Sequence, residues 1–201
     1  MTSEPWLHPY ALYVMSVHCF ISVITISQGQ LLNTYQVWGL EYTIEFDIMV
    51  KKVPTEWTNV FLFTNTMQSM QLQQYGLRTP CVNLEPNVAK LEFASAINSN
   101  LNYVFKYDYT LNQYHHVIIK QFKNDESYTY AIEIDSETVL FMENNNAQQF
   151  YKVSLYASDP WTSPFDYDIG ILKNFEAGRD GSSRNCSCHE PPSHWLSRRV
   201  E

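Results

Sequence analysis

Residues 42–50 read YTIEFDIMV, and this stretch decides the fold class. Every second residue from Tyr42 to Val50 is apolar, and the residues between them include Glu45 and Asp47. Successive side chains of a β-strand point to opposite faces, so this period of two predicts a strand with one buried and one solvated face.

Further extended segments lie on the C-terminal side of this stretch. Residues 57–64 (WTNVFLFT) are apolar on both faces, which predicts a strand that is covered on both sides. The other predicted strands follow at short intervals: 88–94, 101–109, 114–122, 127–134, 138–142, 150–157 and 169–174. Turn residues separate them and no convincing helical period appears, so the chain is predicted to be an all-β sandwich or barrel.

Composition agrees with this class and excludes others. The chain has 201 residues, of which 45% are hydrophobic, enough for one sizeable core. Aromatic residues make up 15%, with 14 Tyr and 11 Phe, which favour sheets. The net charge is −8 and the 13 Lys and Arg residues form no basic cluster, so nucleic acid is not an expected partner.

The N-terminal segment is predicted to be a secretory leader, residues 1–29. Residues 11–26 are largely apolar, and Ser27 and Gly29 provide the small residues that precede a cleavage site. Residues 1–10 contain no Lys or Arg, which departs from the usual leader. A membrane anchor and an N-terminal element of the fold are the alternatives, although a stable anchor usually needs about 20 apolar residues.

The predicted boundaries follow from this leader. The mature domain is expected to span residues 30–175, and residues 176–201, rich in turn formers, are expected to be a flexible tail. The expected location is extracellular. Cleavage removes Cys19 and leaves Cys81, Cys186 and Cys188, an odd number whose pairing stays open.

Several phrases resemble the concanavalin A-like lectin/glucanase superfamily, in its laminin-G-like and pentraxin-like branches. These phrases are YTIEFDIMV (42–50), WTNVFLFTN (57–65), YGLRTP (75–80), YHHVIIKQ (114–121), YTYAIEIDSETVLFMEN (128–144), FYKVSLYASDPW (150–161) and DYDIGILKNF (166–175). The resemblance covers about residues 40–175 and implies a two-sheet antiparallel jelly-roll sandwich. The fold hosts lectins, glycosidases and adhesion modules, so it does not decide the activity.

One string has the residue types of a glycosidase. Glu133, Asp135 and Glu137 match the E-x-D-x-E signature of family-sixteen glucanases, which the resemblance makes relevant. Residues i, i+2 and i+4 of one strand share a face, and retaining glycosidases need two close carboxyl groups. The alternative is that Asp135-Ser136-Glu137 is a hairpin turn, which would bend the backbone and separate the carboxyl groups.

The loop at 158–168 is the main candidate for a ligand site. Asp159, Asp166 and Asp168 offer oxygen ligands of the kind that Ca²⁺ prefers, so this loop is a candidate calcium site. Trp161 and Tyr167 offer flat apolar faces against which a sugar ring can stack. The alternative is structural: Trp161 and Phe165 plug the end of the sandwich while the Asp residues cap turns.

Two further groups complete the candidate residues. Tyr75 and Arg78 in the YGLRTP loop are candidate ligand contacts, since an Arg fork can hold a carboxylate; the alternative is that Arg78 pins its loop to an Asp. His115 and His116 are adjacent, so on a strand they face opposite ways, which predicts one buried and one surface histidine.

These observations favour a secreted, non-enzymatic recognition module that binds carbohydrate or an extracellular protein, with Ca²⁺ as a candidate cofactor. A β-glucanase-like hydrolase using Glu133 and Glu137, and a structural component of the extracellular matrix, are the alternatives. No stable membrane span is expected.

Overall fold

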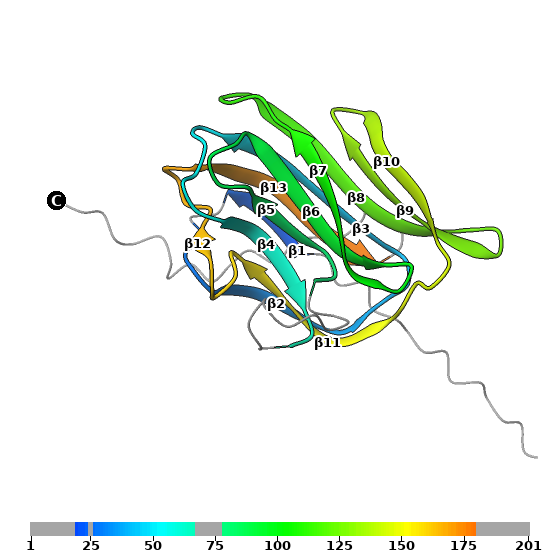
Figure 1. The fold of residues 1–201 in the computed structure, drawn as a ribbon. Coiled ribbons are helices and arrows are strands. Elements are labelled where there is room, and N and C mark those ends of the chain that lie inside the picture. Colours follow the sequence, from blue (N-terminus) through cyan, green and yellow to red (C-terminus); the bar gives the residue numbers. More distant parts are fainter. Residues whose placement is uncertain (1–18, 24–25, 67–77, 180–201) are drawn as a thin grey trace, which may run out of the picture.

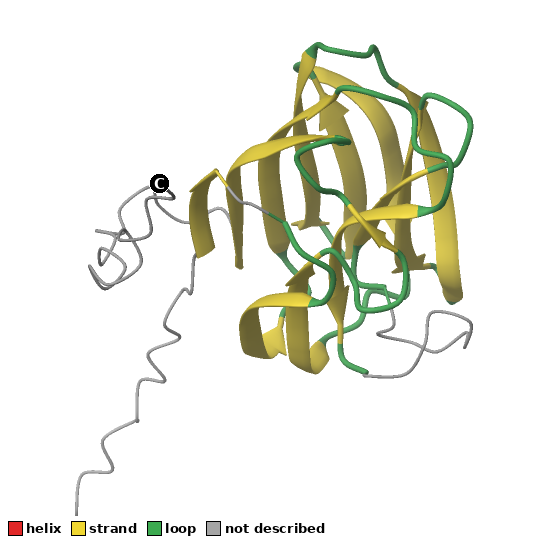
Figure 2. Ribbon diagram, turned by 90° about the vertical axis from the view of Figure 1, so that its left-hand side faces the viewer, coloured by secondary structure: helices red, strands yellow, loops and turns green. Residues whose placement is uncertain are grey.

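The structure is a computed structural model that describes residues 19–23, 26–66 and 78–179. Two antiparallel sheets face each other as two layers (Figure 1). Within these ranges all regular elements are strands, and none is a helix (Figure 2). The predicted all-β, two-sheet jelly-roll sandwich is therefore confirmed.

One sheet has six strands in the order β1-β13-β3-β8-β9-β10. Its strands are β1 (Cys19–Val23), β3 (Tyr42–Val50), β8 (Tyr114–Asn124), β9 (Ser127–Ile134), β10 (Glu137–Asn144) and β13 (Gly170–Arg179). The other has seven strands, in the order β2-β11-β4-β5-β6-β7 with the short β12 paired to β4. Its strands are β2 (Gln30–Trp38), β4 (Thr58–Thr64), β5 (Cys81–Leu84), β6 (Lys90–Ile97), β7 (Asn100–Asp108), β11 (Phe150–Ala157) and β12 (Ser163–Pro164).

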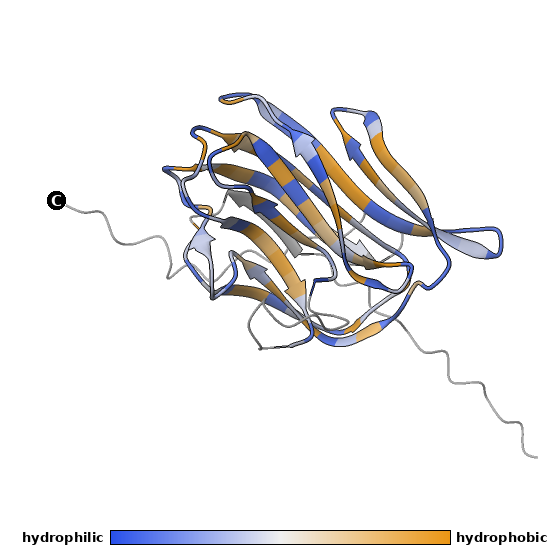
Figure 3. Cartoon of the chain, in the orientation of Figure 1, coloured by the Kyte–Doolittle hydropathy of each residue, from blue (hydrophilic) through white to orange (hydrophobic). Residues whose placement is uncertain are grey.

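The deciding stretch, residues 42–50, is β3, and its bounds are those predicted. It lies between β13 and β8, with Phe46 opposite Val117 and Ile48 opposite both Leu172 and His115. Burial along β3 alternates without exception, because the odd-numbered residues point away from the core. The hydropathy colouring shows apolar segments along the strands and hydrophilic residues concentrated in the connections (Figure 3).

Aromatic rings from both sheets form the centre of the core. Phe46 of the six-stranded sheet contacts Phe61 of the seven-stranded sheet edge to face, with ring centroids 5.2 Å apart. Phe175 packs against the same Phe61 ring at 5.2 Å, and Trp38 packs against Phe63 at 4.5 Å. Such pairs stabilise a core beyond the area that they bury.

One end of the sandwich is closed by Phe165, which belongs to the core. Gly170 makes this closure feasible, because a Cβ atom at this position would lie 2.3 Å from Cζ of Phe165 and 2.4 Å from the carbonyl oxygen of Met49. The structural alternative for Phe165 is thus confirmed. For Trp161 it is wrong, because Trp161 packs on the outside of the seven-stranded sheet.

Several strands differ from the predicted ones in presence or bounds. The sequence pattern does not predict β2, because its apolar residues do not alternate regularly. Residues 66–88 read as a long polar loop that holds short extended pieces, and the four residues of β5 are such a piece, between Pro80 and Pro86. The last strand continues to Arg179, beyond the predicted domain end at 175, because Ala177 pairs with Ile44 and Arg179 with Tyr42.

The predicted leader overlaps described structure. Its residues Cys19–Val23 form β1, which pairs with β13, and Ile26 belongs to the core. The Gly29 N–H donates to the carbonyl of Asp159 at 3.2 Å. The leader stays a prediction, and the predicted tail after residue 179 lies outside the described residues. Within the described ranges, the chain contains no helix with the length and apolarity that a membrane crossing requires.

Candidate functional site

Four polar residues form a row across the outer face of the seven-stranded sheet. The register places Asn59 of β4 opposite Asn83 of β5, Asn83 opposite Glu92 of β6, and Glu92 opposite Lys106 of β7. They point away from the core because their neighbours along each strand, such as Val82, Leu91 and Phe93, point into it. We call these four residues the polar row.

Hydrogen bonds link three members of the polar row, and the fourth, Lys106, bonds a neighbouring carboxylate. Asn59 Nδ2 donates to Asn83 Oδ1 at 2.8 Å, and Asn83 Nδ2 donates to Glu92 Oε1 at 3.4 Å. Lys106 Nζ lies 2.9 Å from Glu85 Oε2, and this hydrogen bond raises the pKa of Lys106. Exposure increases along the row, from the fully buried Asn59 to the exposed Lys106. Solvent therefore reaches the row at its β7 end.

An apolar row runs beside the polar row on the same face. Leu62, Cys81 and Ala94 are fully buried there, although they lie on the side of the sheet opposite the main core. Trp161 and Val104 pack against these three residues and stay partly accessible. The side chain of Trp161 thus covers the centre of the outer face without being enclosed.

Arg78 joins the same face from the segment before β5. Its Nη1 donates to Asn102 Oδ1 at 2.5 Å, so the expected Asp partner is wrong and an amide takes its place. Burial raises the pKa of the Cys81 thiol to about 12, an effect that the positive charge of Arg78 opposes and the negative charges of Asp159 and Glu92 reinforce. These charges act on one thiol because all three groups lie near it.

Two Asp residues of the loop at 158–168 accept hydrogen bonds from backbone N–H groups of the turns in which they lie. Asp159 is fully buried, and its Oδ1 accepts hydrogen bonds from the N–H groups of Trp161 and Thr162, each at 2.7 Å. Asp166 Oδ1 accepts from the N–H groups of Asp168 and Ile169. Across the residues that the structure describes, no three His, Cys, Asp or Glu side chains gather as a metal site. The three Asp residues are not brought together.

The remaining predicted ligand contacts lie elsewhere. Tyr167 is largely exposed, and the ammonium of Lys51, just after β3, lies 3.1 Å from the centroid of its ring. The structure gives it no contact with the outer face of the seven-stranded sheet. Tyr75 falls in 67–77 and lies outside the described residues. Of the predicted contacts, Trp161 and Arg78 therefore share one face.

The glycosidase-like string forms a two-residue turn. Asp135 and Ser136 have φ angles of 53° and 71°, and Glu137 already belongs to the next strand. Glu133 lies 2.5 Å from Lys120 Nζ, and Asp135 accepts from the N–H of His116 at 2.9 Å. The turn places the two Glu residues on neighbouring strands, so the single strand face that the catalytic interpretation needs does not exist here.

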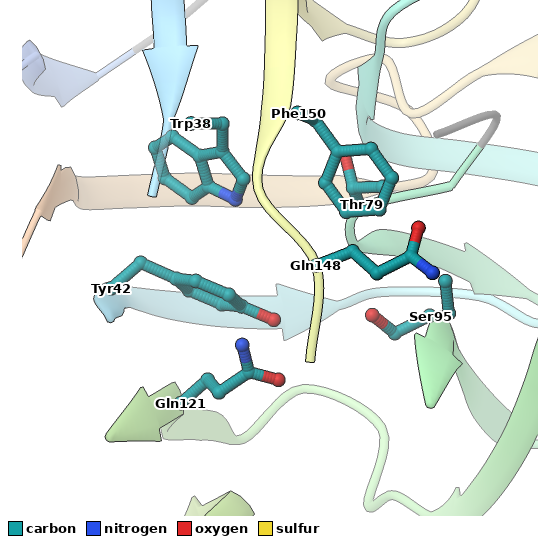
Figure 4. Close-up of a pocket in the computed structure, with 8 residues that line it drawn as sticks. Trp38, Tyr42, Thr79, Ser95, Gln121, Gln148 and Phe150 are labelled. Carbon is teal, nitrogen blue, oxygen red and sulfur yellow. The ribbon is translucent and has the colours of Figure 1, made fainter. Parts of the chain in front are cut away.

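A small cavity lies between the two sheets, away from the outer face (Figure 4). Its lining includes Trp38 and Phe150 from one sheet and Tyr42 and Gln121 from the other. About 10 Å³ is open to the centre of a water molecule, which is room for about one water. Since a ligand pocket usually measures several hundred Å³, this cavity cannot hold a sugar ring.

Sequence reasoning missed the polar row. Asn59, Asn83 and Glu92 each interrupt a short apolar stretch, and this interruption is the signal that a row of buried polar groups leaves in a sequence. The row itself depends on strand register, which one sequence does not provide. His115 and His116 are as predicted: His115 is buried, and the side chain of His116 is 41% exposed.

Comparisons with known proteins support the fold. No protein-family model matches the sequence, and no curated protein matches it significantly. The receptor-binding domain of botulinum neurotoxin D matches with a TM-score of 0.52 and 13% identity, over 84% of this chain and 45% of that chain. Another structure of a botulinum neurotoxin serotype D binding domain gives 0.50 and 14%, over 86% and 41%. A heptameric SAP-like pentraxin from Limulus polyphemus gives 0.49 and 12%, over 81% and 75%.

At these identities the likeness concerns the fold alone. The chain spans less than half the length of the two neurotoxin chains. The chain has a two-sheet jelly-roll fold, which is the fold that the resemblance implies.

Proposed function

We propose that this protein is a non-catalytic recognition module that binds carbohydrate on the outer face of its seven-stranded sheet. The observation that carries the proposal is the position of Trp161 on the same face as Arg78 and the solvated end of the polar row. An indole ring offers a flat apolar surface to the C–H side of a sugar, and Arg78, Asn102 and Lys106 offer groups that bond hydroxyl oxygens.

Two further points support carbohydrate over a purely structural role. The fold is that of a lectin, and the neurotoxin D domain that matches it is by its name a receptor-binding domain. The outer face also keeps polar side chains where apolar ones would suffice for packing, and buried amides are costly unless they are bonded. The hydrogen bonds of the polar row fix the orientation of the exposed groups at its β7 end, and this gives the buried amides a role in binding.

The proposed site needs no calcium, because Asp159 already accepts three hydrogen bonds from its own turn. We further propose that the module acts outside the cell, on the basis of the apolar segment 11–26 and the small residues that follow it.

A glycan array with the purified protein tests the proposal, with a second array in the presence of EDTA. We expect binding that persists in EDTA and falls at least about tenfold in Trp161→Ala, the loss typical of an aromatic hot spot. Trp57→Ala is the matched control, since Trp57 is 41% exposed on a different loop, and it should bind like the wild type.

Other outcomes decide between the alternatives. The absence of detectable glycan binding, both with and without Ca²⁺, would reject carbohydrate binding. Concentration-dependent self-association would then favour a structural role. Trp161→Phe keeps an aromatic ring and should show an affinity between those of the wild type and Trp161→Ala. This variant distinguishes a lost sugar contact from a folding defect in Trp161→Ala. Hydrolysis of a β-glucan that is lost in Glu133→Gln would restore the enzymatic alternative.

A further inference from the structure

His115 is buried at the start of β8 and contacts two different loops. Its Nδ1 lies 2.7 Å from Asp135 Oδ2 in the β9–β10 turn. Its Nε2 accepts a hydrogen bond from the backbone N–H of Thr110, at 3.2 Å, in the loop between β7 and β8. The ring of Tyr107 packs edge to face against the imidazole at 6.2 Å. The imidazole thus connects the turn at 135–136 to the loop at 109–113.

The donor at Thr110 fixes the protonation state of this imidazole. A backbone N–H can only donate, so Nε2 must present its lone pair and carries no proton. The single proton of the neutral ring is therefore on Nδ1, where it is donated to the carboxylate of Asp135. Both ring nitrogens are used, and the ring can do this only while it is uncharged.

His115 faces one carboxylate, that of Asp135, and one backbone donor, the Thr110 N–H. Partial burial would raise the pKa of Asp135, but the His116 N–H and the two histidines outweigh it and hold that pKa below its usual value. Tyr107 faces the ring from β7, and Glu137 acts electrostatically on Tyr107.

We propose that His115 is a pH-sensitive anchor for the loop at 109–113. Protonation of Nε2 turns an acceptor into a donor that faces the Thr110 N–H, so this hydrogen bond breaks. The proton on Nδ1 stays bonded to Asp135, and the neutral pair becomes an ion pair. Tyr109 and Asn112 keep backbone bonds to Ala89 and Val50, so the release is confined to Thr110 and Leu111.

Nuclear magnetic resonance of the wild-type protein tests both parts of the proposal. At pH 7.5, the ¹⁵N signals of His115 should show a proton on Nδ1 and none on Nε2. Between pH 7.5 and pH 5, the amide protection factor of Thr110 should fall about tenfold, as expected for the loss of one hydrogen bond. A proton on Nε2 at pH 7.5, or equal protection at both pH values, would overturn the proposal.

Two variants separate the anchor from a general effect of acid. In His115→Gln the side chain does not titrate, so the protection of Thr110 should become independent of pH. His116→Gln is the matched control, because His116 lies on the outer face between Asp47 and Glu45, and its Thr110 response should remain. A response that disappears in His116→Gln and persists in His115→Gln would assign the effect to the other histidine and reject the anchor.

Discussion

The outer faces of the two sheets differ in character although they belong to one sandwich. On the six-stranded sheet, β3 alternates strictly, and its outward side carries Glu45 and Asp47, which are partly exposed and pair with His116 of β8. His116 lies 2.8 Å from Asp47 and 3.5 Å from Glu45. On the seven-stranded sheet, every residue of β4 and β5 is buried, so its outer face is covered as well as its inner one.

The outer face of the six-stranded sheet is merely solvated, whereas the outer face of the seven-stranded sheet is packed and hydrogen-bonded. Charged pairs on an open face are screened by water and salt, so their arrangement contributes little to stability. Asn59 and Asn83, by contrast, are buried and must keep their partners, because an unsatisfied buried amide costs far more than an exposed one. The covered face therefore has a fixed geometry, which a recognition site requires.

The sharpest way to break this comparison is to remove an apolar side chain from each outer face. Leu62→Ala should destabilise the protein by about 2–4 kcal/mol, because Leu62 is fully buried and leaves a cavity. Ile118→Ala, on the outer face of the six-stranded sheet, should cost less than about 1 kcal/mol because Ile118 is only partly buried. Urea unfolding measures both, and equal losses would contradict the distinction.

A pair of asparagines tests the polar groups in the same way. Asn59→Ala should cost about 1–3 kcal/mol, because the Asp159 N–H and Asn83 Oδ1 lose a buried partner. Asn174 has a φ of 52°, so the matched control is Asn174→Gly, which removes an exposed amide that donates to Asp47 at 2.6 Å without straining the backbone, and it should cost less than about 0.5 kcal/mol. If the two variants unfold at the same urea concentration, the polar row is not the buried network that the structure describes.

The smallest effect is expected for the ion pair between Lys120 and Glu133. Lys120→Ala should lose about 0.2–1 kcal/mol at low salt, because both side chains remain partly exposed. Screening should reduce this loss in 1 M salt, where the Debye length is about 3 Å. The loss in Asn59→Ala should stay constant with salt, so unfolding at two ionic strengths distinguishes the two faces.

The sequence predicts the inner strands of the two sheets better than the edge strand β2. Alternation identifies β3 with its observed bounds, because one of its faces is in the core and the side-chain period is two. The bounds predicted for β9 and β11 are also the observed ones. The strand β2 lacks this regularity because it pairs only on one side, with β11, and much of it is exposed. An edge strand is specified by its neighbour more than by its own pattern.

The candidate site could be predicted only in part. Trp161 and Arg78 attract attention as single residues, and the structure places both on one face. The polar row needs Asn59, Asn83 and Glu92 to fall in register across three strands, which is a property of pairing and not of any one segment. The glycosidase-like string misleads for a related reason. Glu133 and Glu137 are spaced as if on one strand face, but residues with this spacing share a face only where the strand continues, and here a hairpin turn at Asp135 interrupts it.

The contact between Gly170 and Phe165 has a consequence for how this sequence can vary. A side chain at position 170 has no room beside the Phe165 ring and the Met49 carbonyl. A smaller residue at 165 would remove only one of these two clashes, because the Met49 carbonyl belongs to the backbone of β3. We therefore expect glycine to be retained at position 170 in an alignment, also where position 165 varies.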